Sequence, residues 1–182
     1  MGYALKYYDA SLIMRSKDPE TLRTIDLWKF RSGKSHKWYI VEVEHFPSCF
    51  FGIKFYWKGV AASKKRYSLL TNDYEPRTIV MSCIRIMLHY FQEDGRSSFG
   101  FVAARDSQPN LLHGVPNKRF RFYRRMMLSL FSPDKFLQVN DEDHSVYLLV
   151  NRGMLERGDI SIAQIGAEIS NLYEGEFNLT AN

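Results

Sequence analysis

The residues best placed to do chemistry lie in the basic segment NKRFRFYRRMM at 117–127. At about 100° per residue, a helix would bring Lys118, Arg121 and Arg125 to one side, with Arg124 at the edge of this group. Clustered guanidinium and ammonium groups are common contacts for phosphate oxygens. The segment therefore indicates an anion- or partner-binding patch, and an ordinary solvated helix face is the alternative.

The apolar residues of the same segment project away from these cations. We expect them to bury the helix against a sheet rather than to stack on nucleic-acid bases, because they form one wide arc at helical spacing. The arc contains Phe122, Tyr123, Met126, Met127 and Leu130, with Phe120 and Phe131 at its margin.

A second group of polar residues, Ser82, Arg85 and His89, lies within an otherwise apolar segment. Spacings of three and four residues place them on one face of a helix. They could form a small polar site in which His89 acts as an acid or a base. The alternative is that they are the solvated edge of a buried helix.

Other residue types do not form a recognisable catalytic or metal-binding pattern. The run DEDH at 141–144 could hold a divalent cation only if the backbone folded its carboxylates inward, so we expect a solvated turn. The two cysteines, Cys49 and Cys83, lie among apolar neighbours and are expected to be free thiols in a reducing compartment. We therefore predict no catalytic residue and no metal.

Composition is consistent with one folded domain over residues 1–182. The chain is 45% hydrophobic, which is enough for a sizeable core. Its net charge of +5 permits an anionic partner without requiring one. There is no secretory leader pattern and no apolar run of about 18 residues, so we expect a cytoplasmic protein that does not span a membrane.

Hydrophobic periodicity predicts alternating strands and helices. Asp18 and Pro19 are suited to begin a helix, and Asp159 is suited to cap the last one. The predicted α/β (α+β) fold has a single mixed, largely antiparallel sheet flanked by helices. Strands are expected at 3–14, 37–46, 49–59, 65–72, 97–106, 135–141 and 145–151, and helices at 18–30, 76–95, 117–131 and 158–173, with a loop at 106–117.

Four segments carry a resemblance to a known fold: TIVMSCIRIMLHYF, SSFGFVAARD, KRFRFYRRMM and VNDEDHSVYLLVNR. Their order over residues 3–150 resembles the acetyltransferase fold of the Gcn5-related N-acetyltransferase superfamily. The chain also resembles an uncharacterised family of small bacterial proteins, frequent in Bacteroidota, with a degenerate version of that fold. The resemblance implies an acetyltransferase-like topology.

The chain departs from the active superfamily at the turn expected to bind the cofactor. Active members have a glycine-rich turn whose N–H groups hold the pyrophosphate of acetyl-CoA. The corresponding turn here, TNDYEPRT at 71–78, has no glycine, and it carries Asp73, Glu75 and Pro76. Acetyl-CoA is therefore disfavoured as a cofactor.

The sequence thus favours a non-catalytic binding or accessory protein of unknown partner, and the resemblance suggests a bacterial defence or mobile-element context. One alternative is an acyl-CoA-dependent N-acyltransferase with an atypical cofactor loop. The other is a nucleic-acid-binding protein that uses the basic helix 117–131.

Overall fold

The computed structural model describes residues 5–67, 74–102, 118–173 and 178–181. They belong to two compact units. Unit 1 consists of Met1–Glu44 and Ile53–Gly95, and unit 2 consists of His45–Gly52 and Arg96–Asn182. The prediction of one domain over residues 1–182 stays a prediction.

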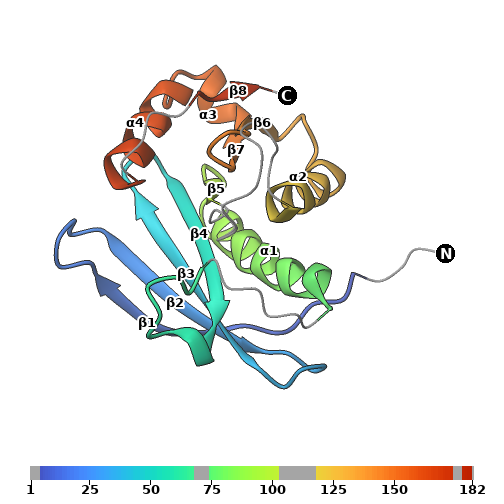
Figure 1. The fold of residues 1–182 in the computed structure, drawn as a ribbon. Coiled ribbons are helices and arrows are strands. Elements are labelled where there is room, and N and C mark those ends of the chain that lie inside the picture. The colour runs from blue at the N-terminus through green and yellow to red at the C-terminus, as the bar shows by residue number, and fades with distance from the viewer. Residues whose placement is uncertain (1–4, 68–73, 103–117, 174–177, 182) are drawn as a thin grey trace. The chain divides into compact units, whose positions relative to one another are not determined.

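Unit 1 is built on strands that pair in sequence order, β1-β2-β3-β4 (Figure 1). The pairs β1–β2 and β2–β3 are antiparallel, and β1 has a bulge between Leu12 and Met14. The last residues of β3 and the first residues of β4 belong to unit 2. The strands are β1 (Ser11–Lys17), β2 (Thr24–Arg31), β3 (Trp38–Phe46) and β4 (Phe50–Trp57), and a short 3-10 helix, η1 (Lys58–Val60), follows them.

Helix α1 (Pro76–Glu93) covers one face of the unit 1 sheet. In β2 every second residue from Asp26 to Phe30 is buried, which is the period-2 pattern of a strand with one face in the core. Asp26 pairs with Val43 and Trp28 pairs with Val41, so these residues lie on the same face. The predicted helix is confirmed, and it buries Ile79, Val80, Met81, Ser82, Cys83, Ile84, Ile86, Met87 and Tyr90.

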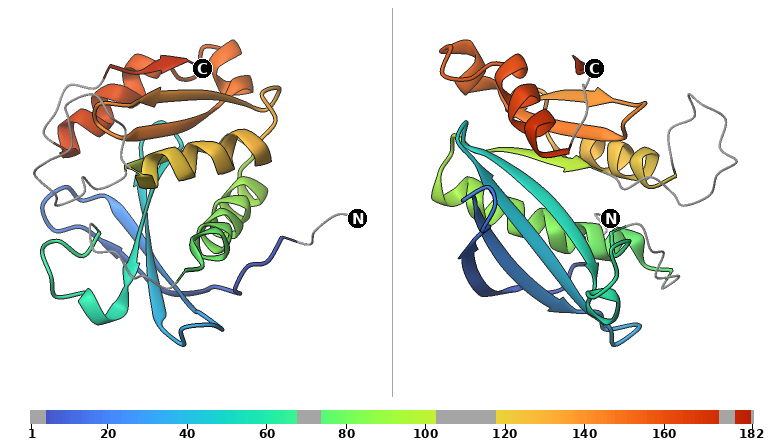
Figure 2. Two further views of the ribbon diagram at one scale, coloured as in Figure 1. Left: turned by 45° about the vertical axis from the view of Figure 1, so that its right-hand side comes forward. Right: turned by 60° about the vertical axis from the view of Figure 1, so that its left-hand side comes forward.

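Unit 2 contains a second set of strands, in the order β5-β7-β6-β8. All three pairings are antiparallel, and the predicted hairpin of β6 and β7 is confirmed (Figure 2). The strands are β5 (Ser98–Val102), β6 (Phe136–Asp141), β7 (Val146–Asn151) and β8 (Thr180–Ala181).

Three helices accompany these strands: α2 (Lys118–Leu130), α3 (Arg152–Glu156) and α4 (Ile162–Tyr173). Helices α2 and α4 were expected, whereas the five-residue α3 and the two-residue β8 were not, because neither is long enough to show a period. The core of this unit joins the hairpin to α4 and contains Phe46, Phe50, Val139, Val146, Leu148, Val150, Met154, Ile160, Ile165 and Ile169.

The helix predicted over 18–30 is wrong, because this segment forms a turn followed by β2. The Asp18 carboxylate accepts hydrogen bonds from the backbone N of Glu20 at 3.0 Å and of Thr21 at 2.8 Å, as an N-cap would. Here these bonds close a turn, which is the other use of an Asp side chain. The three-residue apolar spacing was misleading, since Leu22 is 71% exposed.

Other boundaries also differ from those expected. The first strand begins at Ser11 rather than at residue 3. Residues 65–67 of the strand expected at 65–72 lie in a turn, and 68–72 and the loop 106–117 lie outside the described residues. Helix α4 is capped by Ser161, not by Asp159: the Ser161 hydroxyl accepts a hydrogen bond from the backbone N of Gln164 at 3.1 Å.

The α+β class with largely antiparallel pairing is confirmed. Every strand pair whose register is defined is antiparallel, and helices pack on the strands in both units. Among the helices that the structure describes, none combines the length and the apolar character that crossing a membrane would require.

Packing around Gly100 in unit 2 gives a test of this core. A Cβ atom at this position would clash with the Phe50 ring and lie 2.9 Å from Cδ2 of Leu148. We expect Gly100→Ala to lower the free energy of unfolding by about 1–3 kcal/mol, as overpacking of a core does. Urea denaturation measures the loss.

The matched control is Gly95→Ala, because a Cβ at Gly95 would meet nothing within 4 Å. We expect its effect to stay below about 1 kcal/mol. Equal stabilities of the two variants would contradict the packing around β5.

Candidate functional site

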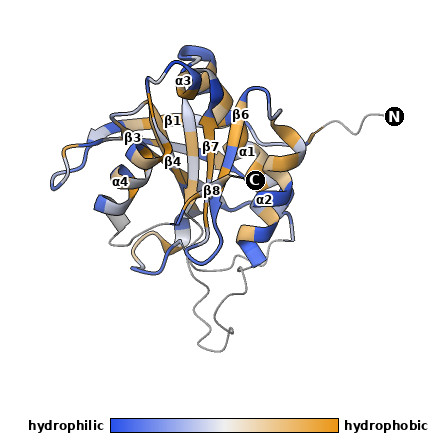
Figure 3. Ribbon diagram, turned by 90° about the horizontal axis from the view of Figure 1, so that it is seen from above, coloured by the Kyte–Doolittle hydropathy of each residue, from blue (hydrophilic) through white to orange (hydrophobic). Residues whose placement is uncertain are grey.

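The solvent-facing side of α2 carries the three cations that the sequence places together. Lys118, Arg121 and Arg125 are exposed, and none of the three makes an ion pair with a residue that the structure describes. Figure 3 shows α2 with hydrophilic and hydrophobic residues along its length. The inner side contains Phe120, Met126 and Met127, which are buried, so this helix is amphipathic as predicted.

Arg124 has a different environment from these three cations. Its Nη1 lies 2.9 Å from Oε1 of Glu142, and both side chains are partly exposed. An ion pair of this kind contributes little stability, on the order of 0–1 kcal/mol. It does occupy the Arg124 guanidinium, so the candidate patch consists of Lys118, Arg121 and Arg125, with Arg124 engaged by the acidic turn.

The acidic turn between β6 and β7 uses its carboxylates internally. Asp141 is buried, and its Oδ1 accepts a hydrogen bond from the backbone N of His144 at 3.1 Å, while Oδ2 lies 2.8 Å from Nδ1 of His144 and accepts from the backbone N of Asn178 at 2.6 Å. Burial raises the pKa of Asp141, but these hydrogen bonds outweigh burial and hold that pKa below its ordinary value. In the described part of the chain, no three His, Cys, Asp or Glu side chains are grouped to hold a metal ion.

Ser82 and Arg85 contact the chain segment that precedes β1. The backbone N of Tyr8 donates to the Ser82 hydroxyl at 2.8 Å, and that hydroxyl donates to the carbonyl of Thr78 at 2.9 Å. The Arg85 guanidinium lies 4.8 Å from the ring centroid of Tyr7. Both predicted site residues thus attach the segment around Tyr7 and Tyr8 to α1.

His89 is on the same helix stripe but contacts other residues. Its ring meets that of Trp28 edge-on, with the centroids 5.1 Å apart, and Nε2 lies 3.3 Å from Oε1 of Glu93. The structure therefore places Ser82 and Arg85 at one contact and His89 at another.

A buried carboxylate on β2, which sequence reasoning missed, connects three elements of unit 1. Asp26 is fully buried, and its two oxygens accept from Nε and Nη2 of Arg15 at 2.7 and 2.8 Å. The Tyr90 hydroxyl donates to Oδ2 at 2.6 Å and accepts from Nε1 of Trp28 at 2.9 Å. Burial and the hydrogen bond to Asp26 raise the pKa of Tyr90, so its hydroxyl stays protonated as a donor.

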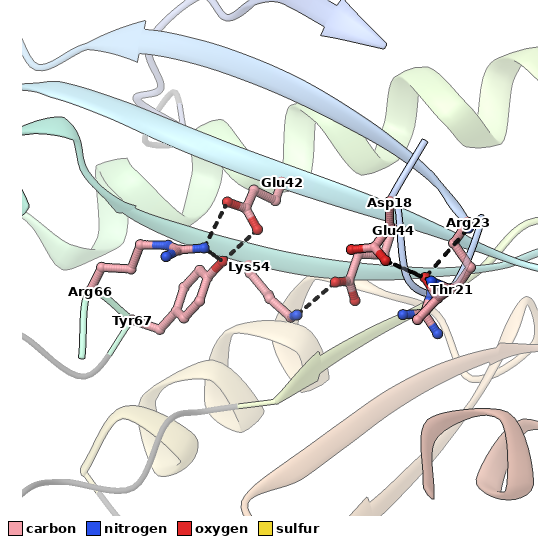
Figure 4. A network of polar contacts seen from close by, with 8 residues as sticks. All are labelled: Asp18, Thr21, Arg23, Glu42, Glu44, Lys54, Arg66 and Tyr67. Atoms are coloured by element: carbon pink, nitrogen blue, oxygen red, sulfur yellow. Dashed lines mark hydrogen bonds and ion pairs between the residues drawn. The ribbon is translucent and has the colours of Figure 1, made fainter. Parts of the chain in front are cut away.

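A second missed cluster lies on the other face of β3 (Figure 4). Glu42 and Glu44 alternate with buried valines and are themselves buried. The Lys54 ammonium lies 2.7 Å from Oε1 of Glu44, and the Tyr67 hydroxyl donates to Oε2 of Glu42. Arg66 lies 3.7 Å from Glu42 and donates to the Tyr67 hydroxyl at 2.9 Å.

This cluster is balanced in charge, with two carboxylates against two cations. Burial raises the pKa of Tyr67 above its ordinary value and the hydrogen bond to Glu42 raises it further, so the phenol remains neutral. The opposite charges of this cluster neutralise one another within the unit. The sequence does contain a signal for it: two glutamates at alternate positions of an apolar strand, VEVE.

Glu75 belongs to the segment 71–78, which the resemblance places at the position of a cofactor loop. Its carboxylate accepts hydrogen bonds from the Tyr8 hydroxyl at 2.7 Å and from the Ser32 hydroxyl, and it is buried. Pro76 occupies the first turn of α1, where it offers no N–H. Asp73 lies outside the described residues. A buried carboxylate directly before α1 opposes a bound pyrophosphate.

Comparison with known proteins does not supply a function. The chain matches no protein-family model, no curated protein and no solved structure. Function must therefore be inferred from the chain's own residues.

The hydrogen bonds of Tyr90 give a prediction for the buried network. Tyr90→Phe leaves the buried Nε1 of Trp28 without this acceptor and removes one donor from Asp26. An unsatisfied buried polar group costs about 1–3 kcal/mol, so we expect the free energy of unfolding to fall by that amount. Tyr74→Phe, at a tyrosine that is 87% exposed, should change it by less than about 0.5 kcal/mol. Thermal and urea unfolding measure both variants. If Tyr90→Phe and Tyr74→Phe lowered the free energy of unfolding equally, the network would be contradicted.

Proposed function

We propose that the chain is a non-catalytic binding protein and that α2 contacts the phosphate groups of a nucleic acid. One observation carries the proposal: Lys118, Arg121 and Arg125 are exposed on one side of α2 without an ion-pair partner among the described residues. Their neighbour Arg124, by contrast, is paired with Glu142.

The spacing of these cations supports a contact with a chain of phosphates. Residues three and four apart on a helix are neighbours, with Cβ atoms about 5–6 Å apart. The three side chains therefore form one row along α2. Like charges in such a row repel one another by a few tenths of a kcal/mol per pair. An anionic partner removes this repulsion, and polyanions gain affinity by releasing their counterions.

The non-catalytic part of the proposal is supported by the way the titratable groups are used. Asp26, Glu42, Glu44, Glu75 and Asp141 are buried and accept hydrogen bonds from groups of their own unit. Burial also raises the pKa of the Cys83 thiol far above neutrality, which makes it a poor nucleophile. These groups serve stability rather than a substrate.

An acetyltransferase-like topology belongs to the same proposal. Its support is the element order: a meander of strands, helix α1, strand β5, helix α2 and the β6–β7 hairpin. The features around Glu75 and Pro76 favour a degenerate form that does not use acetyl-CoA. The bacterial family named above remains a resemblance of sequence pattern only.

The nucleic-acid contact is tested by reversing two charges. We expect the wild-type protein to be retained on duplex DNA at low salt and to dissociate as salt rises. Each lost phosphate contact lowers the slope of log K against log salt by about 0.9, so Arg121→Glu/Arg125→Glu should lower it by roughly two. Fluorescence anisotropy over a salt series measures both slopes.

The control is Lys17→Glu/Lys58→Glu, which makes the same change of net charge at exposed positions of unit 1. It should retain the wild-type slope. If the two double variants lose affinity equally, binding follows net charge and not the patch on α2. If neither loses affinity, the patch is not the contact.

The acyltransferase alternative makes a separate prediction. A ligand that binds only the native state raises apparent stability by RT ln(1 + [L]/Kd), which is about 2.7 kcal/mol at a hundredfold excess over Kd. We expect no rise in melting temperature with millimolar acetyl-CoA. A shift that saturates with ligand, and that grows in Glu75→Gln, would favour the acyltransferase instead.

A further inference from the structure

Two exposed tyrosines of unit 1 each have a cation close to the ring. Tyr74 is 87% exposed and Tyr7 is 40% exposed. The Lys34 ammonium lies 6.0 Å from the ring centroid of Tyr74, and the Arg85 guanidinium lies 4.8 Å from that of Tyr7. Exposed aromatic rings next to cations are the components of sites that bind single-stranded nucleic acid, with bases on the rings and phosphates on the cations.

Tyr74 is held in position by its neighbours although its ring is in solvent. Its φ is 53°, a left-handed conformation that bulky residues rarely adopt. The Lys34 ammonium donates to the carbonyl of Tyr74 at 3.5 Å, and the next residue, Glu75, is bound by Ser32 and Tyr8. Strain that is maintained in this way is a feature of functional sites, and here it projects an aromatic ring that gains nothing from burial within the unit.

Tyr7 belongs to the same surface because Tyr8 connects the two places. The Tyr8 hydroxyl donates to Glu75 at 2.7 Å, and the Tyr8 backbone N donates to Ser82 at 2.8 Å. From Glu75 to Arg85 the helix rises roughly 15 Å, at about 1.5 Å per residue. Successive bases of one strand rise by about 3.4 Å in a duplex, which is much less than this helix rise. The two rings would therefore take different bases of the same strand.

The charge of this surface is positive. Lys34, Arg77 and Arg85 are exposed, and Arg77 makes no ion pair with a described residue. The carboxylate of Glu75 lies directly before α1, and its oxygens accept hydrogen bonds from the Ser32 and Tyr8 hydroxyls, so three cations stand against one buried carboxylate here.

We propose that Tyr7 and Tyr74, together with Lys34, Arg77 and Arg85, form a binding surface for single-stranded nucleic acid. The bases stack on the two tyrosine rings, and the three cations contact the phosphates. This inference goes beyond the proposed function, because it adds a second surface and names the form of nucleic acid that binds there. It depends on residues of unit 1 and not on α2, so it can fail independently.

The test uses the full chain carrying Arg121→Glu/Arg125→Glu, so that the patch on α2 does not contribute. Binding to fluorescein-labelled oligo(dT) is followed by anisotropy at low salt. Loss of one stacked base weakens binding by roughly 5- to 150-fold. We expect a loss of this size in Tyr74→Ala and in Tyr7→Ala, whereas Tyr74→Phe and Tyr7→Phe should bind like the parent because they keep the ring.

Trp38→Ala is the matched control, because Trp38 is 41% exposed and has the Lys29 ammonium 5.3 Å from its ring centroid. It should leave binding unchanged. The proposal is overturned if the parent does not bind oligo(dT), if the alanine variants bind like the parent, or if Trp38→Ala loses as much as they do. If the wild-type protein binds duplex DNA through α2 but the Arg121→Glu/Arg125→Glu parent does not bind oligo(dT), only this inference is overturned.

Discussion

The buried carboxylate of Asp26 is the constraint on which unit 1 depends. A charge without access to water must be paired and hydrogen-bonded, or the group loses its charge. Arg15 meets it from β1 and Tyr90 meets it from α1, while Trp28 supports Tyr90 from the same strand as Asp26. One side chain therefore fixes the edge strand and the helix on the sheet. These positions in turn decide which side of α1 faces the segment around Tyr7 and Tyr8.

In both units, polar groups that stabilise the fold are buried, and the polar groups proposed to bind a partner are exposed. Carboxylates in the interior, such as Glu42 and Asp141, have partners within their own unit. The cations proposed as contacts lie at the surface, and those on α2 have no ion-pair partner among the described residues. These cations remain exposed after the buried carboxylates have formed their internal pairs. The proposal assigns that charge to an anionic partner.

Periodicity was sufficient for the elements whose burial follows one simple pattern. Helices α1 and α2 were predicted from sequence because their apolar residues repeat at helical spacing. The β6–β7 hairpin was predicted because two short segments flank the run DEDH. The segment 18–30 was not, since Asp18 closes a turn with the same hydrogen bonds that would cap a helix. The cations of α2 were predicted because they are local to one helix. The polar networks were not, because Asp26 and Tyr90 are 64 residues apart in sequence and no local pattern relates them.

The central claim is that specific surfaces, not net charge, bind nucleic acid. An NMR titration of the isotopically labelled full chain with oligo(dT) and then with duplex DNA tests it most directly, because each backbone amide reports its own environment. The account predicts that both ligands shift amides of α2 around Arg121 and Arg125, and that oligo(dT) but not duplex DNA shifts amides around Tyr7, Lys34 and Tyr74. Shifts spread over all exposed lysines and arginines, or confined to other parts of the chain, would contradict it.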